Sequence, residues 1–366
     1  MCNFSGVPEK IYYKVYVYGG KMKRTIVFAI TLVMVLALAG NVFAAGGRAR
    51  ELAPMTPAAQ IVPPPGKTLL SLPVDQVSAR PLRIAALMVQ TNPFGIAVLE
   101  GQRFAQQILA DRNVSVTTMA VPGWDVVEWT NLIDTAVTIG YDAIVAFGIS
   151  NALTPVIQRA TNAGIPVFLF NSQLDAPRYH VAWYGQGGMD GGRRVGRMLA
   201  SLMNYTGEFA IITGDFTSIG HEQRRLGARE VLDAIPGMTL VGEIENHDTI
   251  EGAFARANDF ISAFPNLRGI YVTAGGPSGA ARAILDAGLQ DRIILVCHDV
   301  LPEVAPYIER GVIRAALDQD PFNQGFQPII DAFNYLVGGI RPPAETFYEG
   351  TMVTPENIRR YFPGLF

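Results

Sequence analysis

The stretch at 83–108 decides the fold. Residues 83–89 read RIAALMV, an apolar run of the length of one strand, and the turn-like sequence QTNP follows at 90–93. Beyond this turn, apolar side chains recur at helical spacing, at Ile96, Leu99, Phe104 and Ile108. A strand followed directly by a helix predicts a βα unit, the building block of parallel sheets.

The alternation of strand and helix continues to the C-terminal side. Further apolar runs of strand length lie at 114–119, 143–147, 167–170 and 180–183, and then at 209–212, 240–244, 269–272 and 293–296. A long helix that ends near Asn204 separates the two sets. Two consecutive sets of βα units predict an α/β fold with two doubly wound parallel-sheet lobes.

On the N-terminal side, the sequence has the features of a targeting segment. Basic residues at 21–24 precede an apolar run at 26–39, and Val-Phe-Ala at 42–44 gives the small-x-small pattern of a cleavage site. The run is short for a transmembrane helix. We therefore expect residues 1–44 to be a cleaved signal peptide, with Met22 as an alternative true start, and the protein to reside in the periplasm or extracytoplasmic space.

Residues 45–81 connect this segment to the first strand. They are rich in proline, alanine and glycine and show no sustained period. Such a composition predicts a flexible spacer before the globular part.

Composition and missing motifs argue against several classes of function. The formal net charge is -3, and no block of lysine and arginine with interleaved aromatics is present, so nucleic acid is not an expected partner. The two cysteines, Cys2 and Cys297, are too few for a disulfide framework. The sequence contains no G-x-S-x-G, H-E-x-x-H or paired-cysteine motif, and its four histidines are scattered. We therefore expect no enzyme, no metal site and no cofactor.

Polar, charged and aromatic residues gather where the strands are expected to end. In doubly wound sheets, ligands bind at the carboxyl ends of the strands, so these positions form the expected site. They are residues 90–94, 147–148, 171–173, 215–224, 274–276 and 298–299. Amides, a guanidinium, a carboxylate and aromatic faces suit a polyhydroxylated ligand, which needs hydrogen-bonding partners for its hydroxyls and flat apolar surface for its C–H faces.

Short motifs in a consistent order carry a family resemblance from Leu82 to about Ile358. They are NPF at 92–94, EG at 100–101, AGIPV at 163–167, RRLG at 224–227, VCHD at 296–299, GVIRA at 311–315, QDP at 319–321 and VTPEN at 353–357. With these motifs the chain resembles the ribose-binding-type (type I) periplasmic solute-binding proteins of ABC transporters. The effector domains of LacI-type repressors share their fold.

The resemblance implies how the chain is divided between the lobes. In this family the chain crosses between lobes three times, which places the crossings here near 184–185, near 319–320 and near Ile340. The lobes are then expected to comprise 82–184 plus 320–340 and 185–319 plus 341–362. The family's mechanism is hinge closure on the ligand, and a membrane permease recognises the closed form.

The resemblance also implies a set of ligand-binding residues. Asn92, Phe94, Arg224, Asp299 and Gln319 match the family's pattern. The chain departs from it where many pentose binders have other polar or charged residues, at Phe147, Asn171, Ser172 and Gly275. These departures make ribose itself doubtful and favour a less polar ligand, such as a deoxysugar, a cyclitol or another polyol.

Simpler interpretations compete with ligand contact at the charged positions. Asp299 could cap a helix that begins near Pro302. Arg224 could form a surface ion pair with Glu222 or Glu230.

The remaining positions also have structural alternatives. Phe94 and Phe147 could belong to the core, and Asn171 or Ser172 could only close a turn. The glycine-rich stretch at 185–192 invites comparison with a phosphate loop but lacks the required motif, so a hinge and close helix packing are the preferred interpretation.

The expected function is capture of a sugar or sugar-like polyol and its delivery to an ABC transporter permease. Alternatives are a receptor that signals to a chemoreceptor or histidine kinase, and a binder of a nucleoside or a signalling furanose. A repressor is disfavoured because a signal peptide stands where a DNA-binding domain would be. We expect a monomer, because lobe closure needs no partner subunit.

Overall fold

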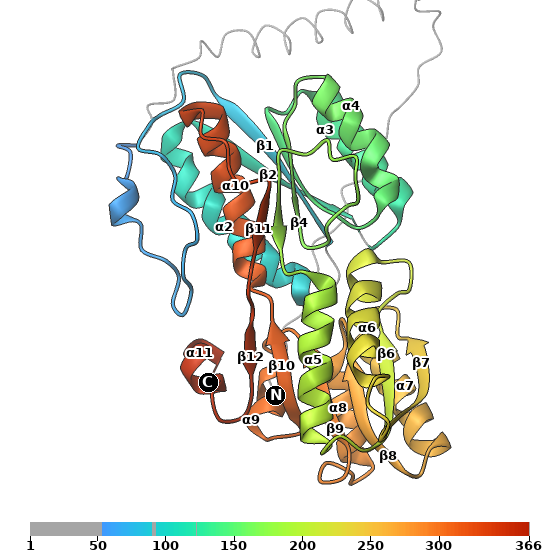
Figure 1. The fold of residues 1–366 in the computed structure, drawn as a ribbon. Helices are drawn as coiled ribbons and strands as arrows, with labels where there is room; N and C mark the ends of the chain where they lie inside the picture. Colours follow the sequence, from blue (N-terminus) through green and yellow to red (C-terminus); the bar gives the residue numbers. More distant parts are fainter. Residues whose placement is uncertain (1–52, 90–92, 122, 366) are drawn as a thin grey trace, which may run out of the picture. The chain divides into compact units, whose positions relative to one another are not determined.

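Two six-stranded sheets organise the computed structural model, which describes residues 53–89, 93–121 and 123–365 (Figure 1). The first sheet has the strand order β11-β5-β4-β3-β1-β2, with parallel pairing throughout. Its strands are β1 (Leu82–Val89), β2 (Val114–Val121), β3 (Ala143–Phe147), β4 (Val167–Phe170), β5 (Ala182–Gly185) and β11 (Glu345–Phe347). The helices of this lobe pack in two pairs, α2 (Pro93–Leu109) with α10 (Pro321–Gly338) and α3 (Val126–Ile139) with α4 (Thr154–Asn162).

The second sheet has the order β12-β10-β9-β8-β6-β7, and in it β12 pairs antiparallel with β10. Its strands are β6 (Gly207–Thr213), β7 (Met238–Glu245), β8 (Leu267–Val272), β9 (Ile294–His298), β10 (Ile313–Asp318) and β12 (Thr351–Val353). The helices of this lobe are α5 (Gly188–Leu202), α6 (Ile219–Leu232), α7 (Ile250–Ala263), α8 (Pro277–Asp286), α9 (Ala305–Glu309) and α11 (Ile358–Tyr361). These two sheets with interleaved helices confirm the predicted fold class.

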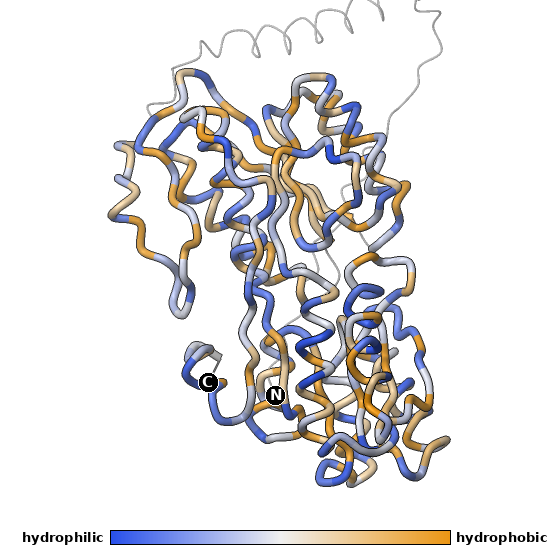
Figure 2. Tube along the Cα trace, in the orientation of Figure 1, coloured by the Kyte–Doolittle hydropathy of each residue, from blue (hydrophilic) through white to orange (hydrophobic). Residues whose placement is uncertain are grey.

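Local sequence explains why the elements form where they do. All residues of β1 except Arg83 are buried, as expected for a central parallel strand covered on both faces. Helix α3 begins after Asp125, whose side chain accepts hydrogen bonds from two backbone N–H groups, and ends at Gly140, which has a left-handed φ of 76°. Figure 2 shows the apolar segments concentrated along the strands of both sheets.

The chain passes between the two sheets three times. It leaves the first sheet after β5, returns between β10 and α10, and leaves again between β11 and β12. The third crossing therefore lies at 348–350, and its expected position near Ile340 is wrong. Residues 341–347 stay with the first lobe because β11 still pairs with β5, with Glu345 opposite Trp183.

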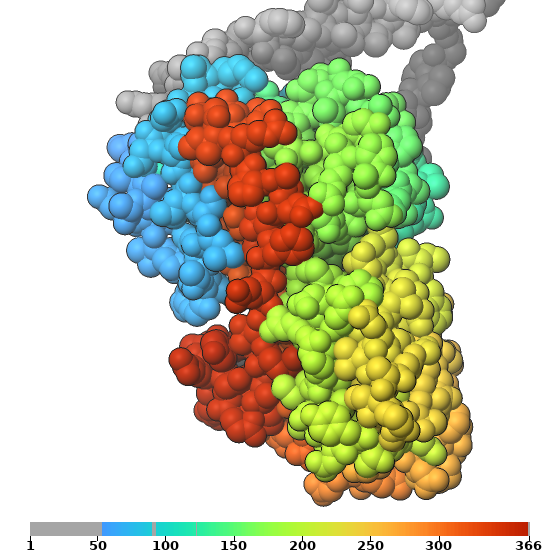
Figure 3. All heavy atoms as spheres, in the orientation of Figure 1, coloured from blue at the N-terminus to red at the C-terminus, as the bar shows by residue number. Residues whose placement is uncertain are grey.

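The N-terminal segment at 53–81 packs against the first lobe instead of forming a free spacer. The backbone N–H of Val74 donates to Asn334 Oδ1 at 2.8 Å, and Asn334 Nδ2 donates to the carbonyl of Leu72 at 2.9 Å. Figure 3 shows this segment, in blue, beside α10, in red. These contacts correct the expectation of a flexible spacer for residues 53–81. The segment has no regular spacing of apolar residues, but polar side chains of α10 form hydrogen bonds with its backbone groups.

Helices α5 and α6 approach each other closely through glycine. A Cβ atom on Gly192 would lie 2.1 Å from the carbonyl oxygen of Arg224, and one on Gly227 would lie 2.2 Å from the carbonyl oxygen of Met189. No side chain fits at either position. Part of the glycine-rich stretch thus serves helix packing, which sets the position of Arg224.

The expected signal peptide at 1–44 lies outside the described residues. Within 53–89, 93–121 and 123–365, no helix has the length and apolar character needed to span a membrane.

Candidate functional site

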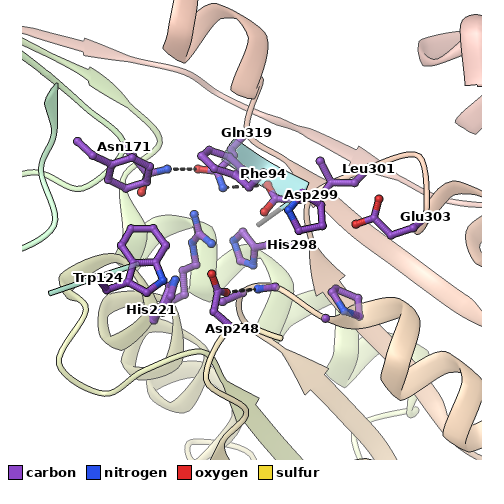
Figure 4. Close-up of a pocket in the computed structure, with 17 residues that line it drawn as sticks. Phe94, Trp124, Asn171, His221, Asp248, His298, Asp299, Leu301, Glu303 and Gln319 are labelled. Atoms are coloured by element: carbon purple, nitrogen blue, oxygen red, sulfur yellow. Dashed lines mark hydrogen bonds between the residues drawn. The ribbon is translucent and has the colours of Figure 1, made fainter. Parts of the chain in front are cut away.

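Residues from both lobes line a cavity at the carboxyl ends of the strands (Figure 4). The first lobe contributes Pro93, Phe94, Trp124, Phe147 and Asn171. The second lobe and the second crossing contribute His221, Arg224, Asp248, Ala274, Gly275, Gly276, Pro277, His298, Asp299, Leu301, Glu303 and Gln319. Its water-accessible volume is about 30 Å³, room for about two or three water molecules.

Most of the residues expected at the site lie together around this cavity. Those that line it are Phe94, Phe147, Asn171, Arg224, Gly275, Asp299 and Gln319. Ser172 is buried but does not line the cavity; its hydroxyl donates to Asn171 Oδ1 at 3.3 Å. Asn92 lies outside the described residues.

Aromatic side chains form one wall of the cavity. Phe147 stands at the centre of this group, with its ring centroid 6.1 Å from that of Phe94 and 5.1 Å from that of Trp124, both in edge-to-face geometry. Phe170 packs on the far side of Phe147 at 4.9 Å. Phe94 and Phe147 are both part of the hydrophobic core and exposed to the cavity, so the two interpretations of these residues are compatible.

Arg224 is buried on α6, and its Nη1 donates to the carbonyl oxygen of Thr273 at 3.0 Å. The alternative of a surface ion pair is wrong: Glu222 pairs with Arg225, and Glu230 pairs with Arg193. The guanidinium therefore lines the cavity. Arginine carries five N–H donors, and those not bonded to Thr273 can donate to a ligand there.

Asp299 follows β9 and has a left-handed φ of 70°, a conformation that aspartate tolerates better than most residues. Its Oδ1 accepts a hydrogen bond from Gln319 Nε2 at 2.8 Å. Burial raises the pKa of Asp299 to about 6, against the opposing effects of the Arg224 charge and of the hydrogen bond from Gln319. The capping alternative fails, because α9 begins at Ala305 and has no side-chain cap.

Asn171 connects the first lobe to the second crossing. Its Nδ2 donates to Gln319 Oε1 at 3.2 Å and to Gln324 Oε1 at 3.0 Å. Gln324 Nε2 in turn donates to the carbonyl oxygen of Gln319 at 2.9 Å. The turn that follows β4 therefore presents an amide to a hydrogen-bonded chain that ends on Asp299.

Sequence reasoning assigned no role to Trp124 or Asp248, and it included His221 only within the expected stretch at 215–224. His221 Nδ1 accepts from the backbone N–H of Asp215 at 3.1 Å, and burial lowers the pKa of His221. Asp248 Oδ1 accepts from the backbone N–H of Gly275 at 2.6 Å. The signal for Asp248 was present, because it comes three residues after β7 ends, at the same edge of the sheet as the other strand ends.

His298 lines the cavity and contacts Tyr271. Its Nδ1 lies 3.0 Å from the hydroxyl oxygen of Tyr271, and burial together with the nearby Arg224 charge holds the pKa of His298 well below its usual range. Among the described residues, no group of three or more histidine, cysteine, aspartate or glutamate side chains is placed to hold a metal ion.

The profile of the family described as periplasmic binding protein domain matches residues 86–340. The chain belongs to this family.

Curated relatives of this periplasmic binding protein are similar over most of its length. It is 29% identical over 286 residues to the D-ribose/D-allose-binding protein of Pseudomonas aeruginosa. This match covers 75% of this chain and 88% of the relative. It is 24% identical over 290 residues to a xylose/arabinose-binding protein of Sulfolobus acidocaldarius, over 75% of this chain and 71% of the relative. These relatives are solute-binding proteins.

Solved structures show the same fold. An ABC transporter solute-binding protein of Bacillus halodurans with bound myo-inositol matches with a TM-score of 0.73 at 16% identity, over 79% of this chain and 99% of the other. A glucose-galactose binding protein of Geobacillus stearothermophilus matches with a TM-score of 0.70 at 23% identity, over 76% of this chain and 99% of the other.

Proposed function

We propose that this protein captures a sugar or sugar-like polyol in the cavity between its lobes, outside the cytoplasm, and delivers it to an ABC transporter permease. One observation carries the proposal: a buried guanidinium, Arg224, and a buried carboxylate, Asp299, face the same cavity as Phe94 and Phe147. The sugars named for the curated relatives support this class of ligand. The permease, the extracytoplasmic location and a monomeric state belong to the proposal.

The side chains of the second lobe can serve both hydrogen-bonding roles of a hydroxyl. Arg224 can only donate, and an ionised Asp299 can only accept, so a hydroxyl between them acts as acceptor and donor at once. Hydrogen bonds to charged groups are stronger than those between neutral groups. Phe94 and Phe147 offer apolar surface to the C–H groups of a ring.

Movement of the lobes would open the cavity to a ligand. The cavity lies between the lobes, and its water-accessible volume in this structure is about 30 Å³. The residues that line it come from elements on both sides of the three crossings, so a hinge motion at 186–187, 319–320 and 348–350 would widen it. A ligand that contacts both walls then favours the closed state by its differential affinity.

A thermal-shift screen of the protein without residues 1–44 tests the proposal. The panel contains monosaccharides, deoxysugars, cyclitols, polyols and nucleosides. A compound present at about 100 times its Kd should stabilise the folded state by about 2.7 kcal/mol and raise the Tm by a few degrees. A sugar or polyol whose shift disappears in Arg224→Ala supports the proposal, whereas a shift with nucleosides alone supports the other ligand class. A well-folded protein that responds to no compound contradicts both.

A further inference from the structure

The N-terminal segment makes a turn beside the second crossing. Residues 63–67, here called the tip, read PPPGK, and the backbone N–H of Lys67 donates to the carbonyl oxygen of Pro64 at 3.0 Å. Lys67 Nζ lies 5.6 Å from the ring centroid of Phe322, at the start of α10. Burial raises the pKa of Asp318, at the end of β10 in the second lobe, to about 7, and the charge of Lys67 acts against this rise. The tip therefore reaches the border between the lobes.

The tip is stiff and is held on the first lobe. Its three consecutive prolines restrict the backbone to an extended form. Directly after the tip, Asn323 Nδ2 of α10 donates to the carbonyl oxygen of Thr68 at 2.8 Å. Asn323 Oδ1 accepts from the backbone N–H of Leu70 at 3.3 Å, and the hydroxyl of Ser71 donates to Asp331 Oδ1 at 2.5 Å. The tip must therefore move with the first lobe.

The C-terminal tail, residues 362–364, is held on the second lobe. It follows β12 and α11, and Ile358 at the start of α11 is buried. The backbone N–H of Phe362 donates to the carbonyl oxygen of Ile358 at 2.8 Å. Asn357 Nδ2 donates to the carbonyl oxygen of Met352, in β12, at 3.1 Å. The tail must therefore move with the second lobe.

The tip and the tail meet at a groove that both lobes line, with a water-accessible volume of about 620 Å³. A Cβ atom on Gly66 would lie 4.0 Å from Cδ of Pro363, an ordinary van der Waals contact. Figure 1 shows the turn of the N-terminal segment, in blue, directed toward α11. Both partners lie outside residues 86–340, where the family profile matches. The contact is therefore an addition to the part of the fold that the profile describes.

We infer that the tip and the tail form a fourth, non-covalent link between the lobes and hold them in the arrangement seen here. The three crossings permit rotation of one lobe against the other. Gly66 and Pro363 move with different lobes and lie outside the crossings, so rotation changes the distance between them. The contact is present where the cavity between the lobes is small, about 30 Å³. It therefore favours this closed arrangement over an open one.

A disulfide tests whether the tip and the tail meet in solution. The protein without residues 1–44 contains one cysteine, Cys297, which is buried. In Gly66→Cys/Pro363→Cys, mild oxidation should join the two new cysteines, because a disulfide needs Cα atoms about 4.4–6.8 Å apart. Val62→Cys/Pro363→Cys is the control, since Val62 is 79% exposed and does not line the groove. The control should cross-link at least about 10-fold more slowly in a free-thiol assay. Equal rates in the two proteins overturn the inference.

Softening the tip tests whether the contact holds the lobes together. Replacement of Pro63, Pro64 and Pro65 by glycine makes the tip flexible and leaves the anchoring residues unchanged. Small-angle X-ray scattering without ligand should then show a larger radius of gyration. Pro57→Gly is the control, because Pro57 is exposed on the same segment and does not line the groove. An unchanged radius of gyration in the folded tip variant overturns the inference. Neither experiment uses a ligand, so either failure leaves the proposed function standing.

Discussion

Asn171 and Asp299 occupy corresponding positions in the two lobes, and Gln319 is hydrogen-bonded between them. Each follows a strand, β4 or β9, and each has a φ of 70°. Each donates its backbone N–H to the next strand of its sheet, Asn171 to Tyr184 and Asp299 to Leu317. The Gln319 amide accepts from Asn171 and donates to Asp299. This chain ties the first lobe to the ligand-facing carboxylate of the second.

Gln324→Met should weaken this connection without altering the cavity lining. It removes the hydrogen bonds of Gln324 to Asn171 and Gln319, each of which is expected to contribute about 1 kcal/mol to the closed arrangement. Small-angle X-ray scattering without ligand should show a larger radius of gyration, and affinity for the identified ligand should fall about five-fold or more. Gln290→Met is the control, because the Oε1 of Gln290 is buried without a partner among the described residues. Scattering identical to that of the unmodified protein would contradict this prediction.

Replacement by alanine should lower ligand affinity at Arg224 but not at its neighbour Arg225. Arg224 faces the cavity, whereas Arg225 pairs with Glu222 and Glu243 away from it. Loss of one or more charged hydrogen bonds to a buried ligand costs about 1.5–3 kcal/mol each. Calorimetry should therefore show at least about a 10-fold loss of affinity for Arg224→Ala and little change for Arg225→Ala. Equal losses in both variants would argue against direct contact by Arg224.

Gly192→Ala should damage both stability and binding. The added Cβ would collide with the carbonyl oxygen of Arg224, so α5 and α6 must separate. Overpacking of this kind costs about 1–3 kcal/mol, and it displaces the arginine proposed to contact the ligand. Urea denaturation and calorimetry measure the two effects. Gly123→Ala is the matched control, since a Cβ there meets no atom within 4 Å; comparable destabilisation in both variants would rule out the helix contact as the cause.

Asp318→Asn should become more stable relative to the unmodified protein as pH rises. Burial raises the pKa of Asp318 to about 7, with further contributions from Asp299 and Asp320. The folded state therefore holds this proton more tightly than the unfolded chain, where an aspartate has a pKa of about 4. The stability that this proton contributes is complete below about pH 4 and is lost as pH rises through about 7. Asparagine does not titrate, so the Asp318→Asn variant does not lose stability in this way as pH rises.

The comparison must be made between the two proteins, because the lowered pKa values of buried histidines such as His221 and His298 act in the opposite direction. Urea denaturation at about pH 4.5 and about pH 7.5 should show a relative gain for Asp318→Asn on the order of 2 kcal/mol. A constant difference between the two proteins across this range would refute the assignment.

Asn334→Ala should release the N-terminal segment from α10. The variant loses the hydrogen bonds with Val74 and Leu72, at a cost of about 1–3 kcal/mol, because the Val74 and Leu72 backbone groups lose their partners. Limited proteolysis should then cleave within 53–81 faster than in the unmodified protein. Asn131→Ala is the control, on an exposed position of α3. Unchanged cleavage would show that other contacts, such as that of Arg112 with Thr56, suffice to hold the segment.

The sequence by itself determined the two lobes and much of the cavity lining. Apolar runs and helical periods are local signals, because burial on a sheet or helix face repeats every few residues. Strand ends are equally local, so Phe94 and Asp299 could be named before the structure was known, whereas Arg224, on α6, was singled out by the family resemblance. In doubly wound sheets, these ends must meet at one edge.

Only the tertiary structure decided the third crossing, the course of the N-terminal segment and the roles of neighbouring charges. Strand β11 is three residues long and only its pairing with β5 identifies it. The segment at 53–81 is ordered by side chains more than two hundred residues away, such as Asn334, which bonds Val74 across 260 positions. Whether Arg224 or Arg225 faces the cavity depends on which side of α6 packs against α5, a contact between chain segments that no local pattern encodes.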